Sequence, residues 1–258
     1  MVRALIGNTG LVGGNLLKQT RFDRLYNSKN ISEVRENEFE YIICAGASGV
    51  KWKANKEPAK DFQNIKSLTA NLQSIKANKF ILISTVDVYQ SPLDVNETSP
   101  ILLEDLIPYG RHRRYLEEFV QNKFANHLII RLPALFGHGL KKNFIFDLIH
   151  NHCLEWTHKD SIYQFYNLGN LYKDIQIAEN HQLKLLNITT EPLSAQLVAK
   201  ECLDFDFQHI TVRKPAIYNV KSMHFPAFGG KNGYLYLKEA VLKDLKEFIQ
   251  LERSKRTS

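Results

Sequence analysis

The stretch that decides the fold is the N-terminus, Met1-Val2-Arg3-Ala4-Leu5-Ile6-Gly7-Asn8-Thr9-Gly10-Leu11-Val12-Gly13-Gly14. Its apolar run at residues 4–6 predicts a buried parallel strand, and the stretch from residue 15 to 18 predicts a helix. Three glycines lie between them with the spacing Gly7-x-x-Gly10-x-x-Gly13. Gly7 permits a tight turn, Gly10 lets backbone N–H groups approach a pyrophosphate, and Gly13 lets the helix pack closely on the strand.

This order of strand, glycine turn and helix predicts a dinucleotide-binding site, because the amides at a helix start carry partial positive charge. An ordinary glycine-rich turn is the alternative, since a glycine triplet alone has little specificity. The residues expected at the cofactor are Gly7, Asn8, Thr9, Gly10, Leu11, Val12 and Gly13.

The second predicted strand, at residues 25–27, bears on the choice between NAD and NADP. In the NAD fingerprint an acidic residue about 20 positions beyond the glycine turn binds the ribose 2′-hydroxyl. Here Asn27, Ser28 and Lys29 stand in its place, so a hydroxyl and a cation replace the carboxylate. That set would accept a 2′-phosphate, and we expect NADP to be preferred over NAD. The alternative is that Lys29 is a solvated surface residue.

Length and composition predict one globular domain over residues 1–258, with a cofactor-binding core at 1–137 and a mixed part at 138–258 that supplies a substrate lobe and a C-terminal helix. The hydrophobic content of 44% is ordinary for a globular protein. We expect no membrane association and a cytoplasmic location, because no apolar run is long enough to span a bilayer and no leader precedes the first strand.

The cysteines and the charge exclude other classes of function. Cys44, Cys153 and Cys202 lack Cys-x-x-Cys spacing, so we expect buried reduced thiols and no metal site. The net charge of +7 would suit a polyanion, but it also suits a groove for phosphorylated ligands. Apart from runs at 111–114 and 253–256 the basic residues are dispersed, which argues against nucleic acid as the partner. Nucleic-acid binding remains a third hypothesis, marked by a steep salt dependence.

The rest of the chain alternates strands and helices, which predicts an α/β fold. Ala45, Gly46 and Ala47 end a buried strand with small residues, as expected beneath a flat ligand. The strand at 79–85 delivers Ser84 and Thr85 to the edge of the sheet where ligands bind. Further strands are expected at 127–137 and 183–188, helices at 61–77, 109–120, 140–149, 195–203 and 238–251, loops at 51–60 and 90–108, and a turn at 228–233.

Beyond residue 150 the pattern becomes irregular and aromatic, which we interpret as the start of a smaller, substrate-facing lobe. Tyr163, Phe165 and Tyr166 fit a core stripe better than a pocket wall. Ser194 is expected to cap the helix that follows it. The predicted fold is therefore a Rossmann-type, doubly wound parallel sheet with a small C-terminal lobe.

Four landmarks occur together: the glycine turn, the stretch Ile83-Ser84-Thr85-Val86-Asp87-Val88-Tyr89, the pair Tyr109-x-x-x-Arg113, and the stretch Arg131-Leu132-Pro133-Ala134-Leu135-Phe136-Gly137. As a set they resemble the extended short-chain dehydrogenase/reductase family, also called the NAD-dependent epimerase/dehydratase family. The likeness covers about residues 1–150. The resemblance implies an NAD(P)-dependent oxidoreductase or epimerase acting on a carbonyl or hydroxyl of a small polar, sugar-nucleotide-derived metabolite.

The resemblance implies catalytic roles for Tyr109 as general acid or base, for Thr85 as its hydroxyl partner, and for Arg113 at the position of a lysine. In the family that lysine holds the nicotinamide ribose and lowers the tyrosine pKa. Pro133 is expected near the cofactor, and a homodimer through the helix that begins at Tyr109 is a further expectation. Each residue also has a structural alternative: Tyr109 as an amphipathic helix residue, Thr85 as a strand end, and Arg113 on a solvated basic face.

This sequence departs from the family at three positions. Arg113 replaces the lysine and cannot relay a proton, because a guanidinium is effectively never deprotonated. Ala134 stands where many epimerases have an asparagine at the substrate diphosphate, and Gln90 stands where glycine is usual. The alternative to an enzyme is therefore a dinucleotide-binding sensor or scaffold with weakened catalysis. His112 and His138 are expected to be surface or structural residues.

Overall fold

A six-stranded parallel sheet forms the centre of the computed structural model, which describes residues 2–257, with side chains as far as residue 255. The strand order β2-β1-β3-β4-β5-β9 reverses direction beside β1, so the sheet is doubly wound. This confirms the predicted Rossmann-type fold. The strands are β1 (Arg3–Ile6), β2 (Arg24–Tyr26), β3 (Glu38–Cys44), β4 (Lys76–Thr85), β5 (His127–Leu132) and β9 (Leu185–Asn187).

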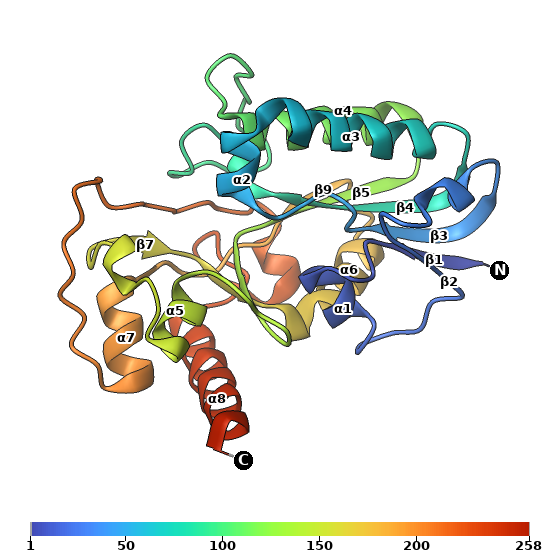
Figure 1. Ribbon diagram of the computed structural model, residues 1–258. Helices are drawn as coiled ribbons and strands as arrows, with labels where there is room; N and C mark the ends of the chain where they lie inside the picture. The colour runs from blue at the N-terminus through green and yellow to red at the C-terminus, as the bar shows by residue number, and fades with distance from the viewer. Residues whose placement is uncertain (1, 258) are drawn as a thin grey trace.

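Helices cover both faces of this sheet (Figure 1). Alternate strand residues point to opposite faces, so Ala4 and Ile42 pack toward α3 and α4, whereas Leu5 and Ile43 pack toward α1 and α6. Apolar side chains on both faces explain why the strands read as continuous hydrophobic runs. The covering helices are α1 (Leu11–Leu16), α3 (Pro58–Leu72), α4 (Pro108–Lys123) and α6 (Leu171–Asn180).

A smaller lobe with its own hydrophobic core lies beside the sheet and contains α5, α7 and α8 (Figure 1). Phe165 is almost completely buried in that core, and Tyr166 is buried beneath α6 in the core of one sheet face. The expected core position is thus confirmed for these two residues, whereas Tyr163 is only partly buried. The elements of the lobe are β6 (Ala134–Phe136), β7 (Ile162–Tyr163), β8 (Phe165–Asn167), β10 (Leu193–Ser194), α5 (Phe144–His150), α7 (Ala195–Leu203) and α8 (Lys238–Thr257). Short 3₁₀ turns are η1 (Ile31–Val34), η2 (Val86–Val88), η3 (Leu154–Trp156), η4 (Leu168–Asn170) and η5 (Phe225–Phe228).

The second half of the chain also completes the main sheet. β9 pairs with β5 as the sixth strand, and α6 covers the same face as α1. The predicted cap at Ser194 is confirmed, because its side chain accepts a hydrogen bond from the Leu197 amide at 3.1 Å. Several other expectations at the level of single elements need correction.

The prediction of a loop at residues 51–60 is wrong, because α2 (Lys51–Lys56) forms there and α3 begins at Pro58. Ala54 is the only buried residue of α2, so the helix leaves no apolar period to read. Helix α6 was not expected either, although its buried residues Leu171, Ile175 and Ala178 have helical spacing. The thiols of Cys153 and Cys202 are partly exposed, and only Cys44 is buried as expected.

No helix within residues 2–257 combines the length and hydrophobicity that a bilayer crossing requires. The same residues contain no cluster of three or more His, Cys, Asp or Glu side chains suited to a metal ion.

Candidate active site

The carboxyl edge of the parallel sheet brings the predicted site residues to one side of the molecule. Strands β1 to β5 all end at this edge, so the residues that follow them are neighbours in space. The glycine turn follows β1, residues 27–29 follow β2, residues 45–47 follow β3, Thr85 ends β4 and Pro133 follows β5.

The glycine turn is packed tightly against the end of β3. Gly7 has φ of +87°, and a Cβ on it would lie 2.3 Å from the carbonyl oxygen of Ala45. A Cβ on Gly13 would lie 2.2 Å from the carbonyl oxygen of Gly7. Gly10 is the N-cap of α1 and has no side chain to satisfy the first amides of that helix. The turn therefore offers backbone amides to an anion at close range.

The end of β2 lies beside the same turn. The Asn27 side chain donates to the Asn8 side-chain oxygen at 3.4 Å and accepts from the Lys29 amide at 2.9 Å. Ser28 and Lys29 are both exposed. The Ser28 hydroxyl and the Lys29 ammonium are therefore exposed at the end of β2, the strand next to the one that leads into the glycine turn.

Tyr109 and Thr85 meet where β4 ends and α4 begins. Tyr109 is 8% exposed and Thr85 is 9% exposed, and the Thr85 side chain lies close enough to the Tyr109 phenol to lower its pKa. Gly110 makes this approach possible, because a Cβ there would lie 2.1 Å from the carbonyl oxygen of Asp87. The structure therefore brings together the acid/base candidate and its expected hydroxyl partner.

The environment of Tyr109 favours the protonated phenol. Burial raises the pKa of Tyr109 above its ordinary value, and the negative charge of Asp87 raises it further. The Arg113 cation, the Thr85 side chain and the Lys51 ammonium lower the pKa, but they do not outweigh burial. The pKa of Tyr109 therefore lies above its ordinary value, and the phenol keeps its proton at neutral pH.

Arg113 is buried rather than part of a solvated basic face. Its guanidinium donates two hydrogen bonds to Asp61, one from Nη2 to Oδ1 at 2.9 Å and one from Nη1 to Oδ2. Nη2 also donates to the carbonyl oxygen of Ser48 at 2.5 Å. Cζ lies 4.1 Å from the centroid of the Tyr109 ring. The cation is thus fixed over the tyrosine and tied to the loop after β3.

Two neighbours complete this arrangement. Nδ1 of His112 lies 2.7 Å from Oδ2 of Asp61, which makes His112 a buried structural residue. Burial acts to raise the pKa of Asp61, but the hydrogen bonds from Arg113 and His112 outweigh it and the pKa is lowered. Asp61 therefore stays ionised beneath the helix that carries Tyr109.

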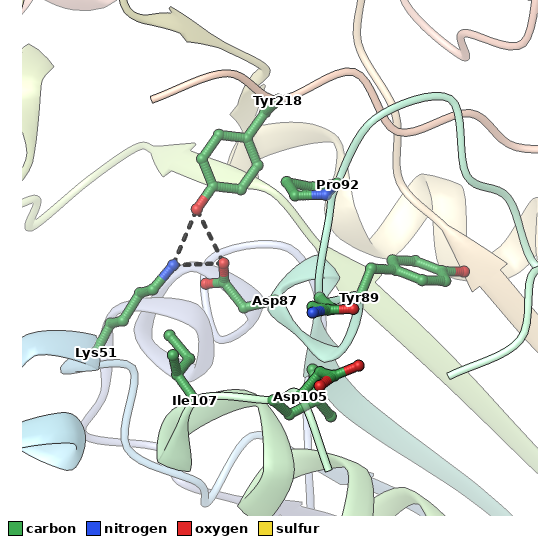
Figure 2. Close-up of a pocket in the computed structure, with 9 residues that line it drawn as sticks. Lys51, Asp87, Tyr89, Pro92, Asp105, Ile107 and Tyr218 are labelled. Atoms are coloured by element: carbon green, nitrogen blue, oxygen red, sulfur yellow. Dashed lines mark hydrogen bonds and ion pairs between the residues drawn. The ribbon is translucent and has the colours of Figure 1, made fainter. Parts of the chain in front are cut away.

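Four polar residues around Tyr109 are not among those that the sequence predicts for the site. Asn55 of α2 accepts a hydrogen bond from the Tyr109 amide at 3.0 Å. Lys51 is on the same helix, one turn earlier, and it pairs with Asp87 and Tyr218 (Figure 2). Asp87 is part of the quoted stretch from Ile83 to Tyr89, so its place beside Thr85 could have been noticed. Nothing in the sequence pairs Lys51 with Tyr218, because they are far apart in the chain and residues 51–60 read as a loop.

A sequence profile of the NAD dependent epimerase/dehydratase family matches residues 20–165, which is more than half of the chain. The chain belongs to the NAD dependent epimerase/dehydratase family. The match begins after the glycine turn and includes Thr85, Tyr109 and Arg113. No curated protein matches the sequence.

Solved structures of several sugar-nucleotide enzymes share this fold. The dTDP-4-dehydrorhamnose reductase of Bacillus anthracis, in complex with NADP, has a TM-score of 0.74 at 18% identity, covering 97% of this chain and 98% of that chain. A UDP-N-acetylglucosamine 4-epimerase of Methanobrevibacter ruminantium has a TM-score of 0.75 at 12% identity, with 98% of each chain covered. An NAD dependent NDP-hexosamine 5,6-dehydratase of tunicamycin biosynthesis has a TM-score of 0.76 at 16% identity, again with 98% of each chain covered. At these identities the similarity establishes the fold.

Proposed function

We propose that the protein is an NADP-dependent oxidoreductase or epimerase that acts on a carbonyl or hydroxyl of a sugar-nucleotide metabolite. The observation that carries this proposal is the meeting of Tyr109 and Thr85, beneath the Arg113 cation, at the sheet edge that also holds the glycine turn. Family membership and the sugar-nucleotide relatives support the substrate class.

The residues at the sheet edge fit a dinucleotide. The glycine turn lets a pyrophosphate approach the backbone, and its N-cap has no competing side chain. Ala45, Gly46 and Ala47 leave room at the end of β3 for a ribose. Arg113 would lie near the nicotinamide end, where its Nε is buried with no hydrogen-bond partner among the described residues. We assign the nicotinamide ribose to this guanidinium and expect Pro133 nearby.

Bound NADPH would supply a hydride to the carbonyl carbon of the substrate. Tyr109 gives its phenolic proton to the carbonyl oxygen, which becomes a hydroxyl. Thr85 holds that oxygen by a hydrogen bond, and the Arg113 cation stabilises the phenolate that Tyr109 leaves behind. In the oxidative direction the same groups act in reverse, with Tyr109 as the base.

The exposed hydroxyl of Ser28 and ammonium of Lys29 support a preference for NADP over NAD. The ammonium would attract the charge of a ribose 2′-phosphate, and the hydroxyl would donate a hydrogen bond to it. The variant Lys29→Glu should weaken NADPH binding about tenfold or more and leave NADH binding nearly unchanged. Equal losses for both cofactors would contradict this assignment.

The proposal is tested by titrating the purified protein with NADPH and NADH in parallel while following nicotinamide fluorescence. Saturable binding of NADPH, tighter than that of NADH, is expected. Turnover is then measured with 4-keto sugar nucleotides for wild type and Tyr109→Phe. The variant should bind NADPH like wild type but lose about 10²- to 10⁴-fold in kcat. Binding of neither cofactor, or full activity of Tyr109→Phe, would overturn the proposal.

A cofactor sensor or scaffold is the second candidate, and the fixed Arg113–Asp61 pair favours it, because a guanidinium cannot relay a proton. Arg113→Lys separates the two candidates. If the wild type is inert and this variant gains reductase activity, the sensor is favoured. If the wild type is active and the change is neutral or harmful, the enzyme is favoured.

Two further expectations belong to this proposal. Helices α3 and α4 lie side by side on one face of the sheet (Figure 1), and we propose this face for a homodimer. Sedimentation at several concentrations tests that state. We also propose a cytoplasmic location, which fractionation of the source cells would test.

A further inference from the structure

A cleft beside Tyr109 contains three polar groups that come from distant parts of the chain (Figure 2). Nζ of Lys51 donates to Oδ1 of Asp87 at 2.6 Å and to the hydroxyl of Tyr218 at 2.9 Å. The Tyr218 hydroxyl donates to the same Asp87 oxygen at 2.9 Å. Lys51 is on α2, Asp87 is in η2, and Tyr218 is on the segment before η5. We call these three residues the polar clamp.

The polar clamp is neutral overall but retains free hydrogen-bonding capacity. An ammonium has three protons, and two of those on Lys51 are used within the clamp. Oδ2 of Asp87 accepts no hydrogen bond from the described residues. Burial acts to lower the pKa of Lys51, but Asp87 and Tyr218 outweigh it and the pKa is raised. The clamp therefore presents one charged donor and one charged acceptor at neutral pH.

The clamp is joined directly to the reacting groups. The Asp87 amide donates to Oγ1 of Thr85 at 3.2 Å, and Gly110 packs against the Asp87 carbonyl. On the other side, Asn55 is one helical turn from Lys51 and accepts from the Tyr109 amide. Hydrogen bonds and backbone packing therefore connect the clamp to both Thr85 and Tyr109.

The cleft has apolar as well as polar walls. It has a volume of about 100 Å³, which is room for several water molecules or one edge of a sugar ring. A sugar ring has apolar C–H faces and hydroxyl edges, and each hydroxyl both donates and accepts. The other lining residues are Tyr89, Gln90, Pro92, Asp105, Leu106 and Ile107.

We propose that the polar clamp of Lys51, Asp87 and Tyr218 is a sugar-ring subsite that selects substrates with uncharged hydroxyls next to the reacting carbon. Lys51 donates to a ring hydroxyl, and the free oxygen of Asp87 accepts from the same or the adjacent hydroxyl. Lys51 and Asp87 already neutralise each other, so a carboxylate or an ammonium on the ring finds no free counter-ion in the clamp and loses its hydration without a full charge in return.

A purely structural ion pair is the competing explanation. The side chains of Lys51 and Asp87 are 39% and 17% exposed, and an ion pair that remains in contact with water contributes little to stability. The two explanations differ in ligand binding. A structural pair would change the stability of the fold and leave the selectivity among ligands unaltered.

The inference rests on the proposed sugar-nucleotide function, and its test uses binding so that it does not depend on turnover. Calorimetry compares UDP-glucose with UDP in the NADP-saturated protein. Wild type should bind UDP-glucose more tightly than UDP. Lys51→Met should weaken UDP-glucose binding about 10- to 100-fold, since it removes hydrogen bonds from a charged donor, and should leave UDP binding unchanged. Lys53→Met, an exposed lysine on the same helix, is the matched control and should behave as wild type.

A second comparison tests the selectivity itself. Asp87→Asn gives the clamp a net positive charge, so the preference for UDP-glucose over UDP-glucuronate should fall at least about tenfold, or reverse. An unchanged UDP-glucose to UDP ratio in Lys51→Met, or an unchanged preference in Asp87→Asn, would overturn the inference. So would a wild type that binds UDP as tightly as UDP-glucose. A wild type that does not bind NADPH, or a Tyr109→Phe variant with full activity, would instead refute the proposed function. Both results come from the separate measurements described above.

Discussion

Asp61 holds Arg113 through both carboxylate oxygens, and this pair places the guanidinium 4.1 Å from the centroid of the Tyr109 ring. Both side chains are buried, at 8% and 3% exposure. The position that carries a lysine in the family is thus occupied by a cation with a fixed partner. Its charge still acts on Tyr109, and Asp61 of α3 sets its position.

Removing the Asp61 charge should therefore destabilise the protein. Asp61→Asn leaves Arg113 buried without its counter-ion, which costs about 3–5 kcal/mol. Urea unfolding at pH 7 measures the loss. The control is Glu38→Gln, which breaks the exposed ion pair with Lys76 and should change stability by less than about 1 kcal/mol. Equal effects of the two variants would show that Arg113 does not depend on Asp61.

The pH dependence of this pair has a definite sign. The folded pKa of Asp61 is lowered, so its stabilising contribution is present above the unfolded value of about 3.9 and is lost as the pH falls through the folded pKa. The stability difference between wild type and Asp61→Asn should therefore shrink as the pH falls below about 4.

Tyr109 should make the two reaction directions respond differently to pH. Because burial raises its pKa, the phenol remains protonated through neutral and mildly alkaline pH. Reduction, which needs the phenol, should have a flat kcat up to about pH 10, the ordinary tyrosine value. The kcat for oxidation, which needs the phenolate, should rise about tenfold per pH unit over the same range. A reductive rate that falls between pH 7 and 8 would mean that another group donates the proton.

The sheet strands and the helices α3 and α4 could be predicted because their signals are local. The apolar runs of β1, β3, β4 and β5 are bounded by turn residues, and the glycine turn fixes where the ligand edge begins. The pairing of Tyr109 with Thr85 followed from the family resemblance, and the close approach depends on Gly110. These features involve short chain separations or known motif spacings.

The partners of the site residues could not be predicted, because they depend on tertiary contacts. The carboxylate of Asp61 reads as an ordinary polar residue of an amphipathic helix, and only the packing of α3 against α4 buries it beside Arg113. Tyr218 reaches Asp87 across 131 positions of the sequence. Helix α2 was missed because six residues with one buried side chain carry no periodic signal.

Glu117 and Arg131 form a second buried ion pair, and breaking it should be as costly as breaking the first. Arg131 donates to Glu117 from Nε at 2.9 Å and from Nη2 at 2.7 Å, and the Ser84 hydroxyl donates at 2.6 Å. Glu117→Gln replaces a charged acceptor with an amide and leaves Arg131 buried and uncompensated. We expect a loss of about 3–5 kcal/mol in urea unfolding. A loss below about 1 kcal/mol, as for an exposed pair, would contradict this expectation.

The stability contribution of Asp174 should depend on pH in the opposite direction to that of Asp61. The residue is 1% exposed and accepts hydrogen bonds from the hydroxyls of Tyr166 at 2.6 Å and Tyr236 at 2.8 Å. Burial raises the pKa of Asp174 to about 6, although both tyrosines lower it in part. The folded protein therefore binds a proton more tightly than the unfolded chain, whose aspartate has a pKa of about 3.9.

The contribution of Asp174 to the free energy of unfolding is consequently greatest below pH 4 and is lost as the pH rises through 6. The shift of about two pKa units corresponds to about 3 kcal/mol. Asp174→Asn cannot titrate, so the stability of wild type relative to this variant should fall by up to about 3 kcal/mol between pH 4 and 7.5. The exposed Asp204 is the control, because Lys200 lowers its pKa and Asp204→Asn should show no such fall. A pH-independent difference for Asp174→Asn would mean that the two tyrosine hydroxyls keep this carboxylate ionised in the fold.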